Sequence, residues 1–285
     1  MLKRSFLAGL SLLLVVSSCA FAQDSPLLGI TLGVKHNDNV NYNPVEEGDS
    51  VFDFGLRITS PYTLSKTLLG QFFYSYKENT YQDNEDLRYS LSEFGVRYFK
   101  KFKKSLIKYE CKSENYGDKY YNATNFGIGI SRKLSKETTG KFEFNLQDRS
   151  YSKNSLYNAQ NTQFKLEAVR KLGSKNSLST SYKFENHNSY TPDYTYEAHI
   201  LGLGYSRKIG KKVDTSLTYQ FRLRDFETAR EDKRNLVNLG VTYKLKEGLA
   251  LTGGYLYLNN NSNSDARDYK NNIFSFGLRV SSKVR

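Results

Sequence analysis

A seven-residue pattern of alternating apolar and small or charged residues recurs seven times along the chain, and it constrains the fold more than any other feature. The copies start at residues 54, 94, 126, 164, 201, 239 and 276, so successive copies lie 40, 32, 38, 37, 38 and 37 residues apart. In the first copy, FGLRITS at 54–60, Phe54, Leu56 and Ile58 alternate with Gly55 and Arg57. A period of two places the apolar side chains on one face of a β-strand, whereas a helix would scatter them around its circumference. The pattern predicts an all-β chain.

The polar segments between the expected strands alternate in length. A short Lys-rich segment follows each of the first six copies, at 60–66, 100–105, 133–138, 171–176, 208–212 and 244–248. A longer polar segment precedes every copy, at 41–50, 81–86, 116–125, 151–160, 190–198, 227–234 and 259–268. Fourteen strands fit between these segments, centred near residues 32, 55, 72, 95, 109, 128, 144, 166, 182, 203, 221, 241, 254 and 277. One repeat is therefore one hairpin, and the number of strands is even.

The N-terminal residues have the features of a secretory signal peptide. Lys3 and Arg4 precede an apolar run from Phe6 to Val16, and Ala20-Phe21-Ala22 forms a small-x-small cleavage site. The apolar run is too short for a membrane-spanning helix, which needs about 20 residues. Cleavage after Ala22 leaves 263 residues and lowers the net charge from +13 to +11, because Lys3 and Arg4 are lost. We therefore expect an exported protein with residues 1–22 as signal peptide and residues 23–285 as a single domain.

The two cysteines bear on how the exported chain is processed. Val16-Ser17-Ser18-Cys19 also fits a loose lipobox, which as an alternative would make Cys19 the lipidated N-terminus. If cleavage follows Ala22, Cys111 is the one cysteine left and no internal disulfide can form. Cys111 shares its strand parity with Ile107 and Tyr109, so we interpret it as a small apolar side chain.

Export, an even number of strands of about ten residues, and the alternation of short turns with longer loops together predict a bacterial outer-membrane β-barrel. Hydrocarbon cannot hydrogen-bond the backbone, so a spanning sheet must close on itself. We predict a transmembrane antiparallel up-and-down barrel of about 14 strands (about 12–16). A soluble β-sandwich seldom has so apolar and aromatic an outer face, and a β-helix has shorter coils of about 20 residues.

The charged residues on the opposite parity are expected to line the lumen. Basic residues outnumber acidic ones there, so an open lumen should favour anions. The candidate basic lining residues are Arg57, Arg97, Lys141, Lys165, Arg222, Arg224 and Arg279. Some of these charges are expected to pair across strands. Tyrosines near the strand ends, among them Tyr74, Tyr76, Tyr121 and Tyr151, predict an interfacial girdle facing lipid.

Charge is also segregated along the membrane normal. With both termini in the periplasm, the Lys-rich turns face the periplasm and the longer, acidic loops face outward. We expect the turns to contact anionic lipid headgroups and the loops to contact lipopolysaccharide. Weak divalent-cation binding is expected at Glu46, Glu47, Asp49, Asp83, Glu85 and Asp86. Nucleic-acid binding is not expected, because the basic residues lie on separate turns. The barrel-assembly machinery is an expected partner during biogenesis.

Catalysis is not expected. The chain has three histidines, His36, His187 and His199, and none lies in a motif of the outer-membrane phospholipases, deacylases or proteases. We therefore predict no catalytic residues, no cofactor and no dedicated metal site.

The segment from Gly33 to Ile58 resembles the first hairpin of the putative β-barrel porin family. Asp38-Asn39-Val40 and Pro44 carry the resemblance, and the hairpin spacing extends it along the chain. The barrel is also similar, more weakly, to that of the surface lipoprotein assembly modifiers. The resemblance implies an outer-membrane channel. Two functions remain open: passive diffusion of small hydrophilic, anionic solutes, or a non-conducting accessory barrel that serves export of polysaccharide or surface protein or acts as a surface anchor.

Overall fold

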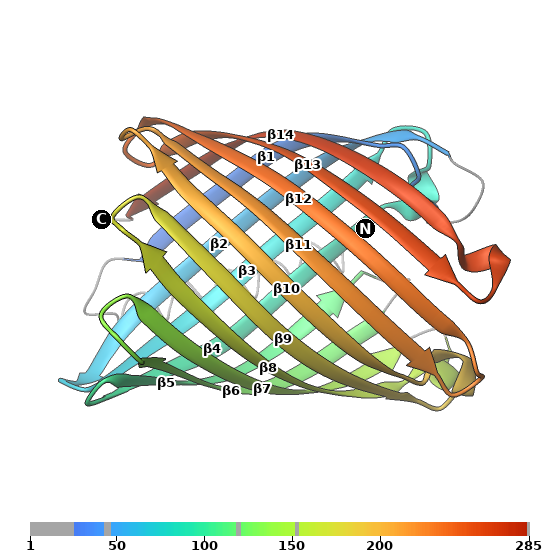
Figure 1. Cartoon of the computed structure of the whole chain (residues 1–285), viewed down its shortest axis with the longest axis horizontal. Helices are drawn as coiled ribbons and strands as arrows, with labels where there is room; N and C mark the ends of the chain where they lie inside the picture. The colour runs from blue at the N-terminus through green and yellow to red at the C-terminus, as the bar shows by residue number, and fades with distance from the viewer. Residues whose placement is uncertain (1–25, 43–46, 118–120, 152–153, 284–285) are drawn as a thin grey trace, which may run out of the picture.

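The computed structural model describes residues 26–42, 47–117, 121–151 and 154–283, which form one closed barrel of fourteen antiparallel strands (Figure 1). The predicted fold class and strand number are confirmed. The strands are β1 (Leu27–Asn37), β2 (Asp49–Ser65), β3 (Leu68–Tyr81), β4 (Tyr89–Phe102), β5 (Ser105–Tyr116), β6 (Tyr121–Lys133), β7 (Thr138–Tyr151), β8 (Ala159–Leu172), β9 (Asn176–Ser189), β10 (Tyr196–Ile209), β11 (Val213–Phe226), β12 (Glu231–Lys246), β13 (Leu249–Ser262) and β14 (Tyr269–Lys283).

The first and last strands close the barrel. Leu32 of β1 is in register with Phe54 of β2 on one side and with Leu278 of β14 on the other. Each strand therefore has a hydrogen-bonded neighbour on both sides. No sheet edge is left to expose unpaired N–H and C=O groups, which is the condition for a sheet to cross hydrocarbon.

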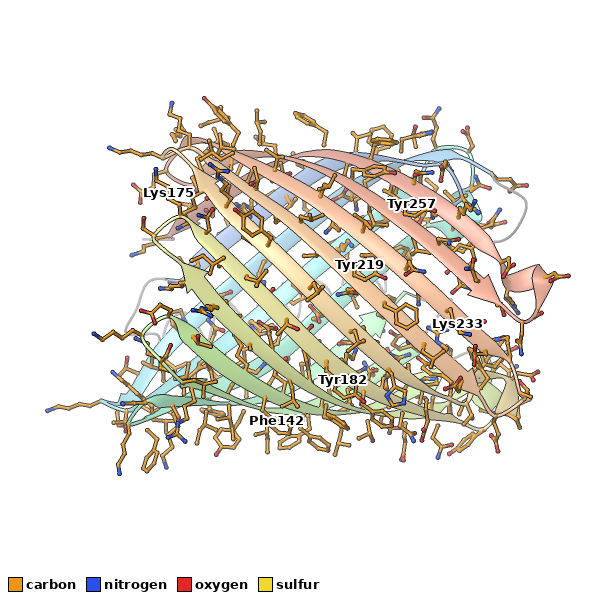
Figure 2. The ribbon with its side chains drawn as sticks, in the orientation of Figure 1. Phe142, Lys175, Tyr182, Tyr219, Lys233 and Tyr257 are labelled. Atoms are coloured by element: carbon orange, nitrogen blue, oxygen red, sulfur yellow. The ribbon has the colours of Figure 1, made fainter. Side chains whose placement is uncertain are left out.

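The outer face of the barrel is apolar. Leu32, Phe54, Phe126, Leu166 and Phe276 have between 37% and 63% of their surface exposed. Figure 2 shows Phe142, Tyr182 and Tyr219 projecting from the outside of the strands. A band of this size would be a liability in water, whereas lipid covers it. Cys111 lies on this face, exposed and without a disulfide, as its parity predicts.

The strand length fits a bilayer. Eight strands, such as β3, β7 and β10, contain 14 residues. At about 3.3 Å per residue such a strand is about 46 Å long, and a tilt of about 45° reduces its rise to about 33 Å. The strands in Figure 1 run obliquely to the long axis of the barrel, as this geometry requires. The rise is close to the thickness of the hydrocarbon core, about 30 Å.

The two ends of the barrel differ. One end carries the short turns, including the one with Lys175, together with the start of β1 and the end of β14; we call it the turn end (Figures 1 and 2). The other, the loop end, carries four 3₁₀ helices, η1 (Glu85–Leu87), η2 (Ser155–Tyr157), η3 (Pro192–Tyr194) and η4 (Asp265–Arg267). Among the described residues no helix is long and apolar enough to cross a membrane.

Several strands extend beyond the apolar alternation. The segment 60–66 was predicted to be a turn, yet β2 continues to Ser65 and leaves Lys66 and Thr67 between β2 and β3. The segment 227–234 was predicted to be a loop, yet β12 begins at Glu231. Hydrogen-bonded pairing does not depend on apolar side chains, so a hairpin continues into water where its residues are polar. The alternation therefore marks only the part of each strand that faces lipid.

A polar clasp holds the loop end of the seam between β1 and β14. Both carboxylate oxygens of Asp38 accept hydrogen bonds from Asn272, one from its backbone N–H and one from its side-chain amide, each 2.6 Å long. The N–H of Asp38 donates to the carbonyl of Asn272 at 3.1 Å. Asn39, which is fully buried, donates its amide to the carbonyl of Lys270 at 3.0 Å, and the amide of Asn271 donates to the carbonyl of Asn39 at 2.9 Å. The Asp-Asn motif that carries the family resemblance thus joins the two ends of the barrel domain.

Candidate functional site

The predicted basic lining residues lie on strand positions of opposite parity to the outer apolar band. Arg57 alternates with Phe54 and Leu56 on β2, and Arg222 alternates with Phe221 and Leu223 on β11. On the other strands, the register places the remaining predicted residues on this same inner face. The positions are Arg57 on β2, Arg97 on β4, Lys141 on β7, Lys165 on β8, Arg222 and Arg224 on β11, and Arg279 on β14.

On the inner face of β1–β8, basic and acidic residues pair. Lys141 and Lys165 share Glu167, at 2.7 and 2.5 Å, because β7 and β8 place Lys141 opposite Glu167. Arg97 lies opposite Glu110 and forms an ion pair with it. The remaining pairs are Lys35–Asp53 (3.0 Å), Lys108–Glu143 (3.9 Å), Lys112–Glu93 (2.8 Å) and Lys112–Glu114 (2.5 Å). Six basic side chains are thus matched by six carboxylates, while Arg57, Lys77 and Arg149, on the same face, have no salt bridge among the described residues.

On the inner face of β9–β12 and in the turn between β11 and β12, near the loop end, basic residues are in excess. The carboxylate of Glu185 is 3.2 Å from Lys183 and 3.5 Å from Arg222. The carboxylate of Asp232 is 4.0 Å from Arg224 and 3.5 Å from Arg230. Arg234 lies directly opposite Arg222 and has no salt bridge among the described residues. Five basic side chains therefore share two carboxylates, which leaves a local excess of three positive charges.

We call Arg222, Arg224, Arg230 and Arg234 the arginine cluster. Aromatic rings hold three of its members in place. The guanidinium of Arg224 is 4.5 Å from the ring centroid of Tyr196, and that of Arg222 is 5.6 Å from it. The guanidinium of Arg230 is 3.4 Å from the centroid of Phe226. Cation–π contacts stabilise a guanidinium without neutralising it, so the positive charge remains available to a solute.

Sequence reasoning found Arg222 and Arg224 but missed Arg230 and Arg234. Both residues fell in the segment 227–234, which was predicted to be a loop. For Arg234, the missed signal is the continuation of the period of two: Arg234, Leu236 and Asn238 share the inner parity of β12. Leu239 and Val241 face lipid, so counting back from them in steps of two would have placed Arg234 on the opposite, inner face. Arg230 lies in the turn before β12, where strand parity gives no signal.

A ladder of tyrosine rings runs along the inner wall at the loop end, from β4 to β7, and continues onto η2 and η3. Neighbouring ring centroids are between 4.5 and 6.3 Å apart. For the four tyrosines on strands, this spacing follows from the separation of adjacent strands, about 4.8 Å. The rings are those of Tyr89, Tyr116, Tyr121, Tyr151, Tyr157 and Tyr194.

The predicted interfacial girdle is therefore wrong for Tyr121 and Tyr151, which belong to the ladder. The guanidinium of Arg149, itself on the inner parity of β7, lies 5.0 Å from the ring of Tyr121. Position near a strand end suggested the girdle, but strand parity decides which face a ring joins. Tyr74 and Tyr76 have outward parity, opposite Ile58 and Leu56, but they lie in the middle of β3 and Tyr74 is only 4% exposed.

Two of the acidic residues proposed for divalent cations, Asp49 and Glu47, have other partners. The carboxylate of Asp49 accepts hydrogen bonds from the backbone N–H groups of residues 82, 83 and 84, at 3.0 to 3.2 Å. Glu47 accepts a hydrogen bond from the amide of Asn41. Among the described residues no group of three or more potential metal ligands occurs, and Asp83 and Asp86 belong to none. Glu46, the side chain of Glu85, Pro44, and residues 1–22 with Cys19 lie outside the described part.

A closed antiparallel barrel with an apolar exterior and a charged interior is the architecture of an outer-membrane porin. The chain has the fold of a porin-like outer-membrane β-barrel. It resembles the putative β-barrel porin family, since the sequence profile of the family described as "Putative beta-barrel porin 2" matches residues 199–282. No curated protein sequence matches the chain significantly.

Solved structures share the fold at low sequence identity. OmpT of Vibrio cholerae superimposes with a TM-score of 0.60 and 12% identity, over 91% of this chain and 99% of that one. An anion-selective porin from Comamonas acidovorans superimposes with a TM-score of 0.57 and 13% identity, over 91% and 100% of the two chains. OccAB3 of Acinetobacter baumannii gives a TM-score of 0.52 and 8% identity, over 92% and 100%. At these identities the likeness concerns the fold.

Proposed function

We propose that the chain is an outer-membrane channel for passive diffusion of small hydrophilic solutes, with a preference for anions. The excess of positive charge on the inner face of β9–β12 is the observation that carries this proposal. Fixed charges inside a low-dielectric wall raise the local concentration of counter-ions, so anions should enter more readily than cations. The wall of β1–β8 is mostly paired, and its basic residues without a salt bridge, Arg57, Lys77 and Arg149, add to the same preference. The Comamonas acidovorans porin, which shares the fold, is itself described as anion-selective.

The first test is electrical. Residues 23–285, refolded and inserted into a planar bilayer, are expected to give steady single-channel currents whose reversal potential in a KCl gradient has the sign of anion preference. The preference should be larger at 0.1 M than at 1 M salt, because the Debye length falls from about 10 Å to about 3 Å. Circular dichroism and heat-modifiable gel mobility confirm folding. A folded barrel without current would refute the channel and favour an accessory or anchoring barrel.

We further propose that the turn end faces the periplasm, with both termini there, and that the loop end faces outward beside lipopolysaccharide. The Lys-rich turns then meet anionic headgroups, at about 1 kcal/mol for each basic residue near the surface. The orientation can be measured by cysteine labelling in a Cys111→Ser background. A membrane-impermeant maleimide should label Asp193→Cys in intact cells, and Lys175→Cys only after the outer membrane is permeabilised. The reverse pattern would refute this orientation.

A further inference from the structure

We propose that the arginine cluster is a binding subsite for a phosphate-class oxyanion, either inorganic phosphate or a phosphate monoester. This inference rests on the proposed channel and names the solute class for which its lumen is built. The cluster lies at the loop end, where a solute from outside would first meet the wall, whereas Arg279 lies near the turn end. The site is made from adjacent strands, so its geometry is held by the sheet and not by a loop alone.

The charge of the cluster matches a dianion better than a single chloride. Arg222 and Arg234 are direct cross-strand neighbours on the same face, and like charges in this position repel each other. An anion with two charges placed between them would remove this repulsion. The two nearby carboxylates, Glu185 and Asp232, are already shared by Lys183 and the other arginines. The local excess of three charges therefore remains for a ligand.

The hydrogen-bonding capacity of the cluster also exceeds what the protein uses. A guanidinium has five N–H donors in a planar fork that matches the oxygens of phosphate. The Nε atoms of Arg222 and Arg224 are buried and have no hydrogen-bond partner among the described residues, and the buried Nε of Arg230 has only a long ion-pair contact, 3.5 Å, with Asp232. Arg222 donates one hydrogen bond, through an Nη atom, to the hydroxyl of Tyr196 at 3.4 Å. Buried donors without partners are uncommon in proteins, and a bound oxyanion would satisfy them.

Neutral polar groups on β8 and β9 lie on the inner face at the same end of the barrel as the arginine cluster. The side chain of Asn161 is 1% exposed, and neither its amide nitrogen nor its oxygen has a partner among the described residues. His187, directly opposite Asn161, stacks on Tyr196 with 4.9 Å between ring centroids, and its Nδ1 atom has no partner either. These groups can donate to and accept from hydroxyls. With these groups, the site can bind the hydroxyls of a phosphate ester as well as the phosphate itself.

The test measures block of the KCl current by inorganic phosphate and, separately, by glycerol phosphate. In the wild-type channel we expect a saturable decrease in current with either probe, and stronger binding of glycerol phosphate if Asn161 and His187 contribute. The double variant Arg222→Gln/Arg224→Gln should weaken phosphate block by about ten- to hundredfold, because charge-assisted hydrogen bonds are lost. The variant Arg279→Gln, an arginine-to-glutamine change at the other end of the lumen, should keep wild-type block.

A second double variant, Arg222→Lys/Arg224→Lys, tests whether phosphate binding depends on the guanidinium groups or only on their positive charge. Lysine retains the positive charge but not the planar fork, so the reversal potential should stay anionic while phosphate block weakens. A conducting wild-type channel that phosphate does not block would overturn the proposal. Equal block in the Gln double variant and in Arg279→Gln would overturn it as well.

A failure of the proposed channel can be distinguished from a failure of the proposed subsite, because phosphate binding can be measured without any current. Inorganic phosphate is titrated with the folded barrel in detergent, and its ³¹P line width is followed for the wild type and the Gln double variant. Broadening that the double variant abolishes would support the subsite even in a barrel that passes no current. An unchanged line width with the folded wild type would refute the subsite whatever the current shows.

Discussion

Replacing Asp38 by alanine is expected to destabilise the closed barrel by about 3 kcal/mol, the largest loss among single changes at the seam. The substitution removes a carboxylate that accepts two hydrogen bonds of 2.6 Å from Asn272. It leaves the amide of Asn272 and its N–H without their acceptor where β1 meets β14. Removing one partner from such a network costs more than the net worth of its bonds, because the other partner stays desolvated. The measurement is urea unfolding in lipid vesicles, followed by heat-modifiable gel mobility.

The matched control is Asp193→Ala, an exposed carboxylate in η3 at the same end of the barrel. This variant should unfold within about 0.5 kcal/mol of the wild type, as exposed substitutions usually do. If Asp38→Ala and Asp193→Ala unfold alike, the clasp does not hold the seam. The variant Asn272→Ala should reproduce much of the effect of Asp38→Ala. The double variant should cost less than the sum of the single ones, since both remove the same interaction.

Replacing Gly95 by valine is expected to destabilise the barrel by about 3 kcal/mol and to lower the folded yield. A Cβ atom at Gly95 would lie 2.6 Å from the carbonyl oxygen of Cys111 and 2.7 Å from both the Cβ of Lys112 and the ring of Phe73. Phe73 is 1% exposed and cannot move away freely, because the guanidinium of Arg97 lies 3.8 Å from its ring centroid. The folded fraction after refolding, together with the urea midpoint, measures the effect.

Gly29→Val is the control for this substitution. Gly29 lies on the inner face of β1, and a Cβ atom there would have no neighbour closer than 3.9 Å. Valine favours strands, so Gly29→Val should be neutral or slightly stabilising. Equal losses for both variants would mean that glycine is needed on the inner face for sheet curvature in general. Close packing of Phe73 against Gly95 would then not be the cause.

Strand parity explains which parts of this molecule could be predicted. The alternation around Phe54, Phe126 and Phe276 is repeated often enough to locate all fourteen strands and to assign their faces. Which residues face each other across neighbouring strands could not be predicted in the same way. The pairing of Arg97 with Glu110 depends on the register between two strands, which the hairpin turn sets and the alternation does not.

The errors at the loop end have the same origin. Beyond the hydrocarbon, residues on both faces are polar, so the contrast that reveals parity disappears. Tyr151 was therefore placed outside and Arg234 in a loop, although both continue the inner faces of their strands. Asp49 was taken for a free acidic rim residue, yet its carboxylate organises the turn at 82–84. A polar sequence indicates that a segment is hydrated, but it does not indicate whether the segment is ordered.

The clasp at the seam has a consequence for how barrels of this kind can change size. Residues 38 and 39, which follow the first strand, bind residues 270–272 of the last strand, and no strand between them takes part in these bonds. Whole hairpins could therefore be duplicated or deleted in the interior of the chain while the matched ends still meet. The first and last hairpins are the parts that cannot be exchanged for interior copies. In this architecture the ends specify closure, and the repeats between them set the diameter.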